Sequence, residues 1–546
     1  MKYRKKLAVL SVVLTICLPG ITGCGNEKNS TEIPSTTEID TTDESQSDTA
    51  EGDNSENNQQ SGTLLDYDLG EAYLLESNGR KVPYEVQGVL GIPDGQDCPV
   101  VVLIHGAHPI EKASLSRYDQ GFNYLTQALS DEGNLVIGMN IAMNYSFEDG
   151  EPNGNERTRQ IVAKQLELLQ QAVKGDESVF KYDLTKVGDF SKVVLVGHSR
   201  GGFDALECAE SLPEEMQTVG IACVAPSEYM EPETALPNVP IGIIIPQMDG
   251  DVIMLDGSDI YERCIADKEY TRTAELIYLK NANHGYFNTK LTEPDLNHNE
   301  EDVKKLMPAE QQRHFLTQYL IEFVKKAVDE GETGFASQGS LPSQLYGCDT
   351  VIRVHSGEST EVWSAEDGEA LICNGPVVAE QQIASYLPDK NTVKYFKLPG
   401  GSSLKSYGLT SIRWNGEGAS VTIPLGESPE PGRFLDIDMA IDSTDVHNTA
   451  GQPMTLIFTD KDGNEEKYVV GENEAPLLWQ EGELEEIMGW DGEKDWEYST
   501  YTPLGTLRID LNRLSQDDSG KWKSLRMEWN DSPQGSIMLR SIRSIP

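Results

Sequence analysis

The sequence predicts an α/β domain followed by an all-β domain, and three observations predict this order. Between residues 63 and 330, continuous apolar runs alternate with segments of helical periodicity, which is typical of βαβ units around a parallel sheet. In residues 346–546, short runs of alternating polarity are separated by turn residues, which is typical of a β-sandwich. The chain of 546 residues is also longer than one hydrophobic core supports.

The first 24 residues have the three parts of an export signal. A basic start, Met1–Lys6, precedes an apolar stretch, Leu7–Leu18, that is too short to span a membrane comfortably as a mature helix. The next segment ends in Ile21-Thr22-Gly23-Cys24 and resembles a bacterial lipobox. This resemblance implies cleavage before Cys24 and a lipid on its sulfur, which anchors the protein at the extracellular face of a bacterial cell membrane. An ordinary signal peptide with a chance cysteine is the alternative.

Residues 25–62 consist almost entirely of Ser, Thr, Asn, Gln, Glu and Asp. Such a composition cannot bury a core, so we expect a disordered acidic tether between the anchor and the first domain. The formal net charge of the chain is −46, which argues against nucleic acid as a partner and favours solubility outside the cell. The cysteines form no Cys-x-x-Cys pair, so no zinc ribbon is expected, and the sequence leaves disulfide pairing open.

The elements of the first domain follow one another in a regular order. Residues 82–92 alternate in polarity as in an early antiparallel edge strand, whereas the later runs are continuously apolar as in buried parallel strands. Apolar residues at helical spacing between Arg157 and Val173 predict a helix before the third of these runs. The predicted buried strands are 99–104, 135–139, 192–197, 221–225, 240–245 and 274–279.

The motif Gly197-His198-Ser199-Arg200-Gly201 breaks one of these strands and opens a helix. A sharp strand-to-helix turn strains the serine backbone and exposes its hydroxyl, and the two glycines let neighbouring backbone approach closely. The motif therefore nominates Ser199 as a nucleophile. Two backbone N–H groups are needed to hold the oxyanion of an acyl-transfer reaction. We expect them from Arg200 and from Ala107 or a near neighbour in the loop after the strand 99–104, although His105-Gly106 could simply close that strand.

An acid and a histidine are expected downstream, at the ends of later strands. Asp249 lies in the loop after the strand 240–245 and is the preferred acid, while Asp251 in the same loop stays open as the alternative. His284 lies in the loop after the strand 274–279, which places it at the same sheet edge as Ser199. The sequence therefore predicts a Ser199, His284 and Asp249 triad.

The order Ser199, Asp249, His284, each at the end of a predicted strand, resembles the α/β-hydrolase superfamily over residues 66–330. The resemblance implies a mostly parallel, eight-stranded sheet with flanking helices, in which Ser199 attacks an acyl carbon, His284 acts as base and then acid, and Asp249 orients it. Within the superfamily the chain looks most like dienelactone-hydrolase-like and acetylhydrolase-like esterases. Dienelactone hydrolases use a cysteine nucleophile, so their specific reaction is not carried over to Ser199.

A linker is expected at 331–345 and a β-sandwich at 346–546. The latter resembles the jelly-roll fold of galactose-binding-like and carbohydrate-binding modules, which implies a role in holding polysaccharide. Six tryptophans of this part could stack on sugars, although large aromatics are more often buried in the core. They are Trp414, Trp479, Trp490, Trp496, Trp522 and Trp529.

Together these observations predict a surface-anchored serine carboxylester hydrolase that acts through an acyl-enzyme. The expected substrate is a small-molecule or polysaccharide ester, and the mechanism requires no metal and no cofactor. Two alternatives stay open. One is a non-catalytic surface glycan-binding protein with a hydrolase-like domain, and the other is a serine peptidase, since the same triad hydrolyses amides.

Overall fold

The computed structural model describes most of the chain after the predicted tether. The described residues are 62–76, 78–107, 117–142, 154–213, 215–227, 236–252, 256–295, 300–384, 407–426, 432–442, 445, 447–448, 451–478, 484–488, 494–498, 503–514 and 522–546. The predicted signal segment with Cys24, the tether up to residue 61, Trp479 and Trp490 lie outside them. Among the described residues, no helix is both long and apolar enough to cross a membrane.

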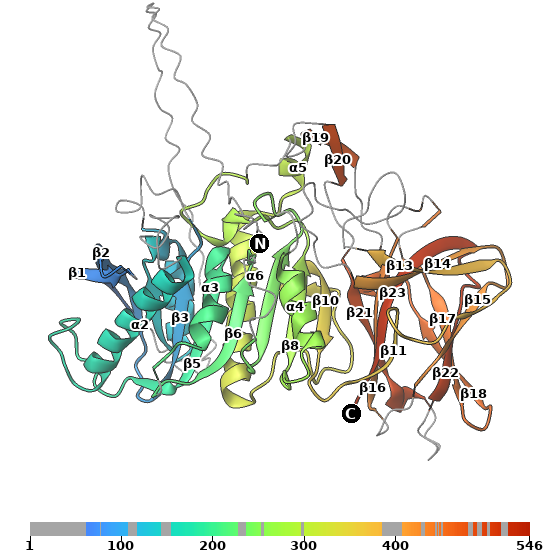
Figure 1. Ribbon diagram of the computed structural model, residues 1–546, viewed down its shortest axis with the longest axis horizontal. Helices are drawn as coiled ribbons and strands as arrows, with labels where there is room; N and C mark the ends of the chain where they lie inside the picture. Colours follow the sequence, from blue (N-terminus) through green and yellow to red (C-terminus); the bar gives the residue numbers. More distant parts are fainter. Residues whose placement is uncertain are drawn as a thin grey trace, which may run out of the picture. The chain divides into compact units, whose positions relative to one another are not determined.

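A ten-stranded sheet organises the first part of the described chain (Figure 1), in the order β1-β2-β4-β3-β5-β6-β7-β8-β10-β9. The central strands, from β4 to β8, pair in parallel. The outer strands pair antiparallel at both sides. Its strands are β1 (Thr63–Leu75), β2 (Lys81–Ile92), β3 (Cys98–Ile104), β4 (Leu135–Met139), β5 (Gly188–His198), β6 (Thr218–Val224), β7 (Ile241–Pro246), β8 (Ala274–Leu279), β9 (Gln344–Leu345) and β10 (Cys348–His355).

Helices connect these strands and cover the sheet. The α-helices are α1 (Asn123–Asp131), α2 (Gly154–Val173), α3 (Arg200–Ala209), α4 (Asp256–Ala266), α5 (Glu300–Lys305) and α6 (Ala309–Asp329), and the 3₁₀ turns are η2 (Tyr118–Phe122) and η4 (Gly285–Phe287). Side chains of α2, α3 and α4 share one buried apolar cluster, whereas those of α1 and α6 share another. The helices therefore cover opposite faces of the sheet.

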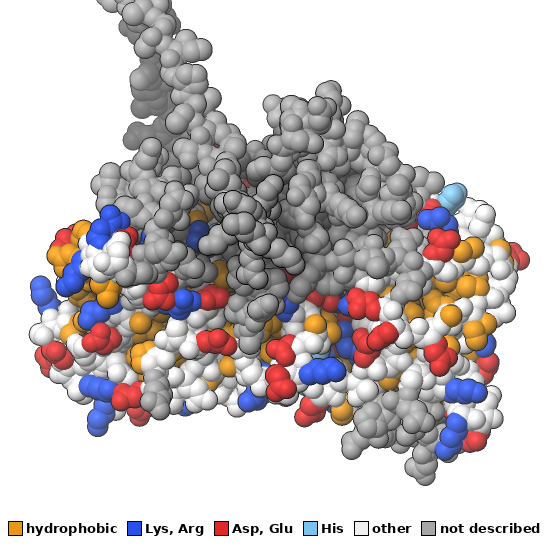
Figure 2. Space-filling view, viewed as in Figure 1, with side chains coloured by type: hydrophobic (Ala, Val, Ile, Leu, Met, Phe, Trp, Pro, Cys, Tyr) orange, Lys and Arg blue, Asp and Glu red, His pale blue; other side chains and the backbone are white. Residues whose placement is uncertain are grey.

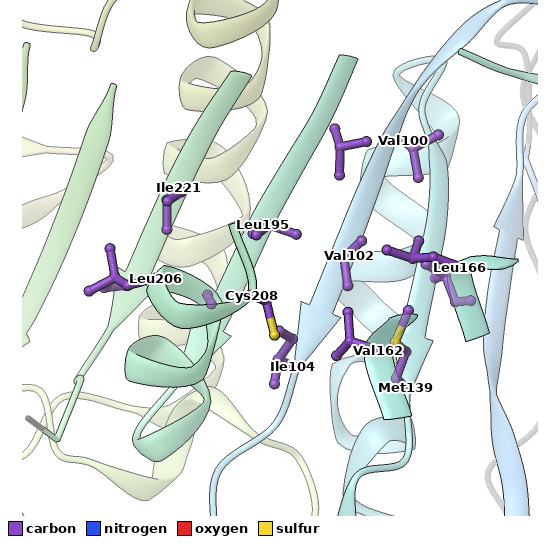
Figure 3. Packing of buried hydrophobic residues seen from close by; sticks show 14 of the residues in the cluster. Val100, Val102, Ile104, Met139, Val162, Leu166, Leu195, Leu206, Cys208 and Ile221 are labelled. Carbon is purple, nitrogen blue, oxygen red and sulfur yellow. The ribbon is translucent and has the colours of Figure 1, made fainter. Parts of the chain in front are cut away.

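The central strands are continuously apolar because both of their faces are buried. Successive side chains of a strand point to opposite faces, and Val100 and Val102 of β3 belong to the cluster with α2 and α3, while Val101 and Leu103 belong to the cluster with α1 and α6. Figure 3 shows the first of these clusters, with the labelled side chains of β3 beside those of the neighbouring helices. Because helices bury both faces of the sheet, its central strands are held in place, and with them the strand ends at which the sequence predicts the active site.

The sheet is wider than the sequence predicts. We expected residues 82–92 to form the edge strand, but β1 pairs outside β2. β1 was missed because polar residues interrupt its apolar ones, so it lacks the continuous apolar run of the central strands, and only Tyr67 and Leu74 of its side chains are buried. We also expected the β-sandwich to begin at residue 346, but β10 pairs antiparallel with β8 and extends the first sheet. A run of apolar residues does not tell which of two sheets a strand will join.

The second part consists of two antiparallel sheets packed face to face, as expected for a β-sandwich. One has six strands, ordered β13-β14-β23-β16-β21 with β11 beside β23, and the other has five, ordered β12-β15-β22-β17-β18. Both contribute to one apolar cluster. The strands are β11 (Thr360–Ser364), β12 (Ile372–Asn374), β13 (Val377–Ala384), β14 (Tyr407–Asn415), β15 (Ser420–Pro424), β16 (Phe434–Ile441), β17 (Met454–Asp460), β18 (Glu465–Val470), β21 (Gly505–Asp510), β22 (Trp522–Glu528) and β23 (Gln534–Ile545).

Three shorter features complete this part of the chain. Two 3₁₀ turns, η5 (Ala475–Leu477) and η6 (Leu511–Arg513), lie between the strands of the sandwich. The strands β19 (Leu484–Met488) and β20 (Lys494–Tyr498) pair only with each other, and β20 contains Trp496. The jelly-roll resemblance of this sandwich stays a prediction.

The tryptophans of the sandwich are largely core residues where the structure describes their side chains. Trp414 and Trp529 are fully buried and stack on each other with ring centroids 4.3 Å apart. Trp522 is half-buried and packs against Phe458. The faces of Trp414 and Trp529 are therefore occupied by protein and not open to a sugar.

Buried ion pairs connect the sandwich to the first sheet. Arg353 of β10 donates to Glu262 of α4 at 2.7 Å and to Asp438 of β16 at 2.8 Å, and Arg543 of β23 donates to the same Asp438 oxygen at 2.8 Å. Burial raises the pKa of Asp438, but Arg543 and Arg353 outweigh it and hold that pKa below its usual range. Elements of both parts of the chain thus share one desolvated charge cluster.

The predicted linker, 331–345, is a packed connection. Phe335 is only 3% exposed, and Arg508 of β21 donates to the carbonyl oxygens of Phe335, Ala336 and Gln338 at 2.9–3.0 Å. The other guanidinium nitrogens of Arg508 hold Asp436 at 2.7 Å. Because one fully buried side chain binds both the connection and the sandwich, the two are fixed to each other.

The described residues carry mixed surface charges and free cysteines. Acidic and basic side chains are interspersed over the described part of the face in Figure 2. Cys208 and Cys223 are buried, as their apolar context predicts, and the described cysteines are all free. The described residues contain no cluster of three or more His, Cys, Asp or Glu suited to a metal ion.

Candidate active site

The nucleophile candidate Ser199 lies between the end of β5 and the first residue of α3. Its backbone has φ 56° and ψ −130°, a conformation that a residue with a side chain rarely adopts and that costs on the order of 1–3 kcal/mol. The turn is held by hydrogen bonds: Ser199 N–H donates to Val224 O, and Gly202 N–H donates to Ser199 O, both at 2.8 Å. A strained serine held in this way at a strand end is the geometry of a nucleophile elbow.

Glycines surround Ser199 because the backbone is too close for side chains. A Cβ on Gly197 would lie 1.9 Å from Gly201 O, and a Cβ on Gly201 would lie 2.4 Å from Ile104 O. A Cβ on Gly106 would lie 2.7 Å from the Cβ of Ser199 itself. The third contact brings the loop after β3 directly against the serine, where the sequence predicts the oxyanion loop.

The structure brings His284 and Asp249 together. Nδ1 of His284 lies 2.9 Å from Oδ2 of Asp249, and both side chains are buried, with exposed fractions of 6% and 3%. The other carboxylate oxygen of Asp249 accepts the N–H groups of Asp251 and Val252 at 3.0 and 2.6 Å. Because its own loop occupies Oδ1, the carboxylate presents Oδ2 to the imidazole in a fixed direction.

Asp251, the alternative acid, faces the other side of the ring. Its Oδ2 lies 3.5 Å from Nε2 of His284, and its side chain is 68% exposed. Among the described residues, no hydrogen bond joins Nε2 to the Ser199 hydroxyl; catalytic contacts often tighten only when substrate is bound. The two aspartates thus lie at different ring nitrogens, Asp249 at Nδ1 and Asp251 at Nε2.

The surrounding carboxylates change the acidity of His284. Burial lowers the pKa of the imidazole, but Asp249, Asp251 and Asp295 favour its charged form, and the pKa rises to about 9. The site therefore stabilises an imidazolium. This is the charge that a general base acquires when it takes a proton from serine.

His198, the residue before Ser199, supports the histidine loop. Its Nε2 lies 3.0 Å from the carbonyl oxygen of His284, so Nε2–H is the donor, and the two rings lie 4.8 Å apart. Burial lowers the pKa of His198 to about 3, so the ring stays neutral. The nucleophile turn and the histidine loop are thereby joined directly.

The candidate oxyanion donors belong to the two segments that meet at Ser199, the start of α3 and the loop after β3. Arg200 is the first residue of α3 and directly follows Ser199, so its backbone N–H lies next to the nucleophile candidate. Ala107 follows the loop that contacts Ser199 through Gly106. His105 fixes that loop, since its Nδ1 donates to Gly106 O at 2.8 Å and its Nε2 accepts the N–H of Ile141 at 3.0 Å.

Besides the role of His198, sequence reasoning missed two further residues that hold the histidine loop. Gln312 of α6, fully buried, donates to Asn283 O at 2.7 Å and accepts Asn283 N–H at 3.1 Å. Asp295 accepts N–H groups from the loops that carry Asp249 and His284. Neither has a sequence signal, because the positions of these side chains depend on tertiary folding.

The comparisons with known proteins find similar structures only. No family model and no curated protein matches the chain. A dienelactone hydrolase-like promiscuous phosphotriesterase from metagenomic libraries is similar at 15% identity and a TM-score of 0.27, over 45% of this chain and 94% of that one. An esterase from Pyrobaculum calidifontis is similar at 12% identity and a TM-score of 0.30, over 50% of this chain and 87% of that one. The strand order and serine turn of the present chain are themselves α/β-hydrolase-like.

Proposed function

We propose that the protein is a serine hydrolase that cleaves carboxylic esters through an acyl-enzyme. The observation that carries the proposal is the buried His284–Asp249 pair, joined at 2.9 Å, at the sheet edge where the strained turn presents Ser199. A nucleophile, a base and a residue that orients the base are the groups that acyl transfer requires.

Each residue has a defined step in the proposed reaction. His284 Nε2 takes the proton of the Ser199 hydroxyl as the serine oxygen attacks the ester carbonyl carbon. Asp249 holds Nδ1–H and stabilises the imidazolium that forms. The backbone N–H groups of Arg200 and Ala107 receive the oxyanion of the tetrahedral intermediate.

The second half of the reaction uses the same groups in reverse roles. His284 gives its proton to the departing alcohol and leaves the acyl group on Ser199 Oγ. A water molecule, deprotonated by His284, then attacks this ester, and His284 returns the proton to Ser199 Oγ as the acid leaves. The chemistry needs only the side chains and backbone of the chain, so no cofactor is part of the proposal.

The substrate and the location extend the proposal beyond the site. We propose a small-molecule or polysaccharide ester as substrate. From the sequence of the export signal, we also propose anchorage through a lipid on Cys24 at the extracellular face of a bacterial membrane.

Glycan binding by the sandwich receives no support from Trp414 and Trp529, whose ring faces are buried. A sugar site would have to use other groups.

The test compares wild type with Ser199→Ala on matched ester and amide substrates. We expect hydrolysis of aryl acetates and butyrates by wild type, a loss of at least about 10³-fold in Ser199→Ala, and slower cleavage of the corresponding anilides. Faster cleavage of anilides would support the peptidase reading. Absence of both activities in folded wild type, with retained binding to polysaccharide, would support the glycan-binding reading.

A further inference from the structure

We propose that Asp295 is a positioning residue of the active site. Its carboxylate joins the loop that carries Asp249 to the loop that carries His284 and holds the two loops in the relative position that catalysis needs. This inference deepens the proposed function and rests on it for its catalytic consequence. The geometric part, that one carboxylate couples the two loops, is independent of any activity.

Three backbone hydrogen bonds carry the proposal. Oδ2 of Asp295 accepts the N–H of His284 at 2.6 Å and the N–H of Gly250 at 3.1 Å. Oδ1 accepts the N–H of Gly285 at 2.9 Å. Gly250 directly follows Asp249 in the chain, so one carboxylate binds the main chain beside both members of the His–Asp pair.

Gly285 leaves room for the close approach of Asp295. A Cβ at Gly285 would lie 3.2 Å from Oδ1 of Asp295, which is tighter than an ordinary contact. The glycine after the histidine thus leaves room for the carboxylate to reach two consecutive N–H groups. Hydrogen bonds from backbone N–H groups to an ionised carboxylate are shorter and stronger than those between neutral groups, so they suit a rigid connection.

The relative position of the two loops has to be held by tertiary contacts because the loops are far apart in sequence. His284 and Asp249 are separated by 35 residues, and one 2.9 Å hydrogen bond joins their side chains. Elsewhere the loops are joined by main-chain bonds such as Met248 N–H to Ala282 O at 2.8 Å. Asp295 adds hydrogen bonds to His284 itself and to the residue after Asp249, and a displacement of about 1 Å there is enough to cost about 10²-fold in rate.

Asp295 also adds negative charge beside the imidazole. Its carboxylate is one of those that raise the pKa of His284. Removing the charge should therefore move the acid limb of the pH profile to lower pH. A group that only stabilised the fold would leave this limb in place, which separates the two roles.

The principal test uses Asp295→Asn in the full-length protein, with Glu293→Gln as matched control. Glu293 lies two residues away and is exposed, so the control removes the same charge without the hydrogen bonds. For Asp295→Asn we expect kcat to fall about 10²-fold with KM within about threefold, and the acid limb to shift down. Asp295→Glu, which keeps the carboxylate, should recover part of kcat. Retention of the wild-type kcat and acid limb in Asp295→Asn would overturn the proposal.

Hydrogen–deuterium exchange tests the coupling without activity. Peptides covering 247–252 and 281–287 should exchange slowly in wild type and in Glu293→Gln, and both should exchange faster in Asp295→Asn. If Asp295→Asn does not fold, Asp295→Glu carries the same measurement with a smaller change. Unchanged exchange in both peptides of a folded variant would contradict the coupling. Inactive wild type with the expected exchange pattern would overturn the proposed function and leave the coupling standing.

Discussion

The carboxylate of Asp251 lies 3.5 Å from Nε2 of His284, on the ring nitrogen opposite to the one that Asp249 holds at 2.9 Å. The imidazole therefore lies between two negative charges. Nε2 is the atom that must accept the proton of Ser199 in the proposed mechanism. In the structure it faces Asp251, so this exposed residue has a direct influence on the base.

The first prediction concerns pH. With the pKa of His284 raised to about 9, the base is mostly protonated at neutral pH, so kcat/KM of wild type should rise with pH and level off above about 9. Asp251→Asn should move this acid limb down and raise kcat/KM at pH 7 by about threefold to tenfold, equivalent to a shift of half to one pKa unit. Full pH profiles of both proteins measure this shift. An acid limb at the same pH in both would contradict the influence assigned to Asp251.

The second prediction concerns the loop against the nucleophile. Gly106→Ala would put a methyl group 2.7 Å from the Cβ of Ser199, so the loop or the serine must move. We expect kcat on aryl esters to fall by about 10²-fold. Gly334→Ala is the control, since a Cβ there meets nothing within 4 Å. Equal kcat in the two variants would show that the loop tolerates displacement.

The third prediction concerns the charge cluster between the two parts of the chain. Arg353→Ala leaves Glu262 and Asp438 without the donors at 2.7 and 2.8 Å, and breaking a buried pair costs about 3–5 kcal/mol. Arg526→Ala breaks pairs with Glu465 and Glu528, whose side chains are 43% and 25% exposed, and should cost less than about 1 kcal/mol. Urea unfolding of both variants checks the difference. Similar losses would argue against a strongly desolvated cluster.

The fourth prediction concerns Glu275, a fully buried acid of β8. Burial raises its pKa from 4.5 to about 7, although Tyr319 O–H at 2.8 Å favours the ionised form. Between these two pH values the unfolded chain is ionised while the folded chain stays protonated, so raising the pH favours unfolding. The free energy of unfolding should fall by about 3 kcal/mol through this window and level off above it.

Glu275→Gln is expected to lose this contribution to the pH dependence. Urea unfolding at pH 5 and pH 8 in wild type, in Glu275→Gln and in the exposed control Glu269→Gln measures it. The control should keep the wild-type difference between the two pH values. A difference of the same size in Glu275→Gln would assign the effect to other groups.

Much of the central sheet could be predicted because its residues obey local rules. Val100 to Ile104 are continuously apolar because helices cover both sides of β3, and the Gly-x-Ser-x-Gly pattern gave the strand-to-helix turn at Ser199, which the structure has. The edges could not be predicted in the same way. β1 lies largely exposed at the edge and has no continuous apolar run, and the pairing of β10 with β8 joins residues of distant sequence.

The residues of the candidate site also divide into those that the sequence predicts and those that it does not. Ser199, Asp249 and His284 follow strands, so their place at one edge follows from the parallel order. The two aspartates of one loop could not be separated from the sequence, since their roles depend on which ring nitrogen each faces. Asp295, Gln312 and His198 were missed because they act through backbone hydrogen bonds, for which residue type gives no signal.

The central claim is that Ser199 is a nucleophile activated by His284 and Asp249. The most direct measurement is covalent labelling of the full-length protein by a fluorophosphonate, followed by mass spectrometry of the labelled peptide. We expect one label on Ser199 that is absent from Ser199→Ala and forms much more slowly in His284→Ala. A folded wild type that stays unlabelled, or a label on another serine, would contradict it.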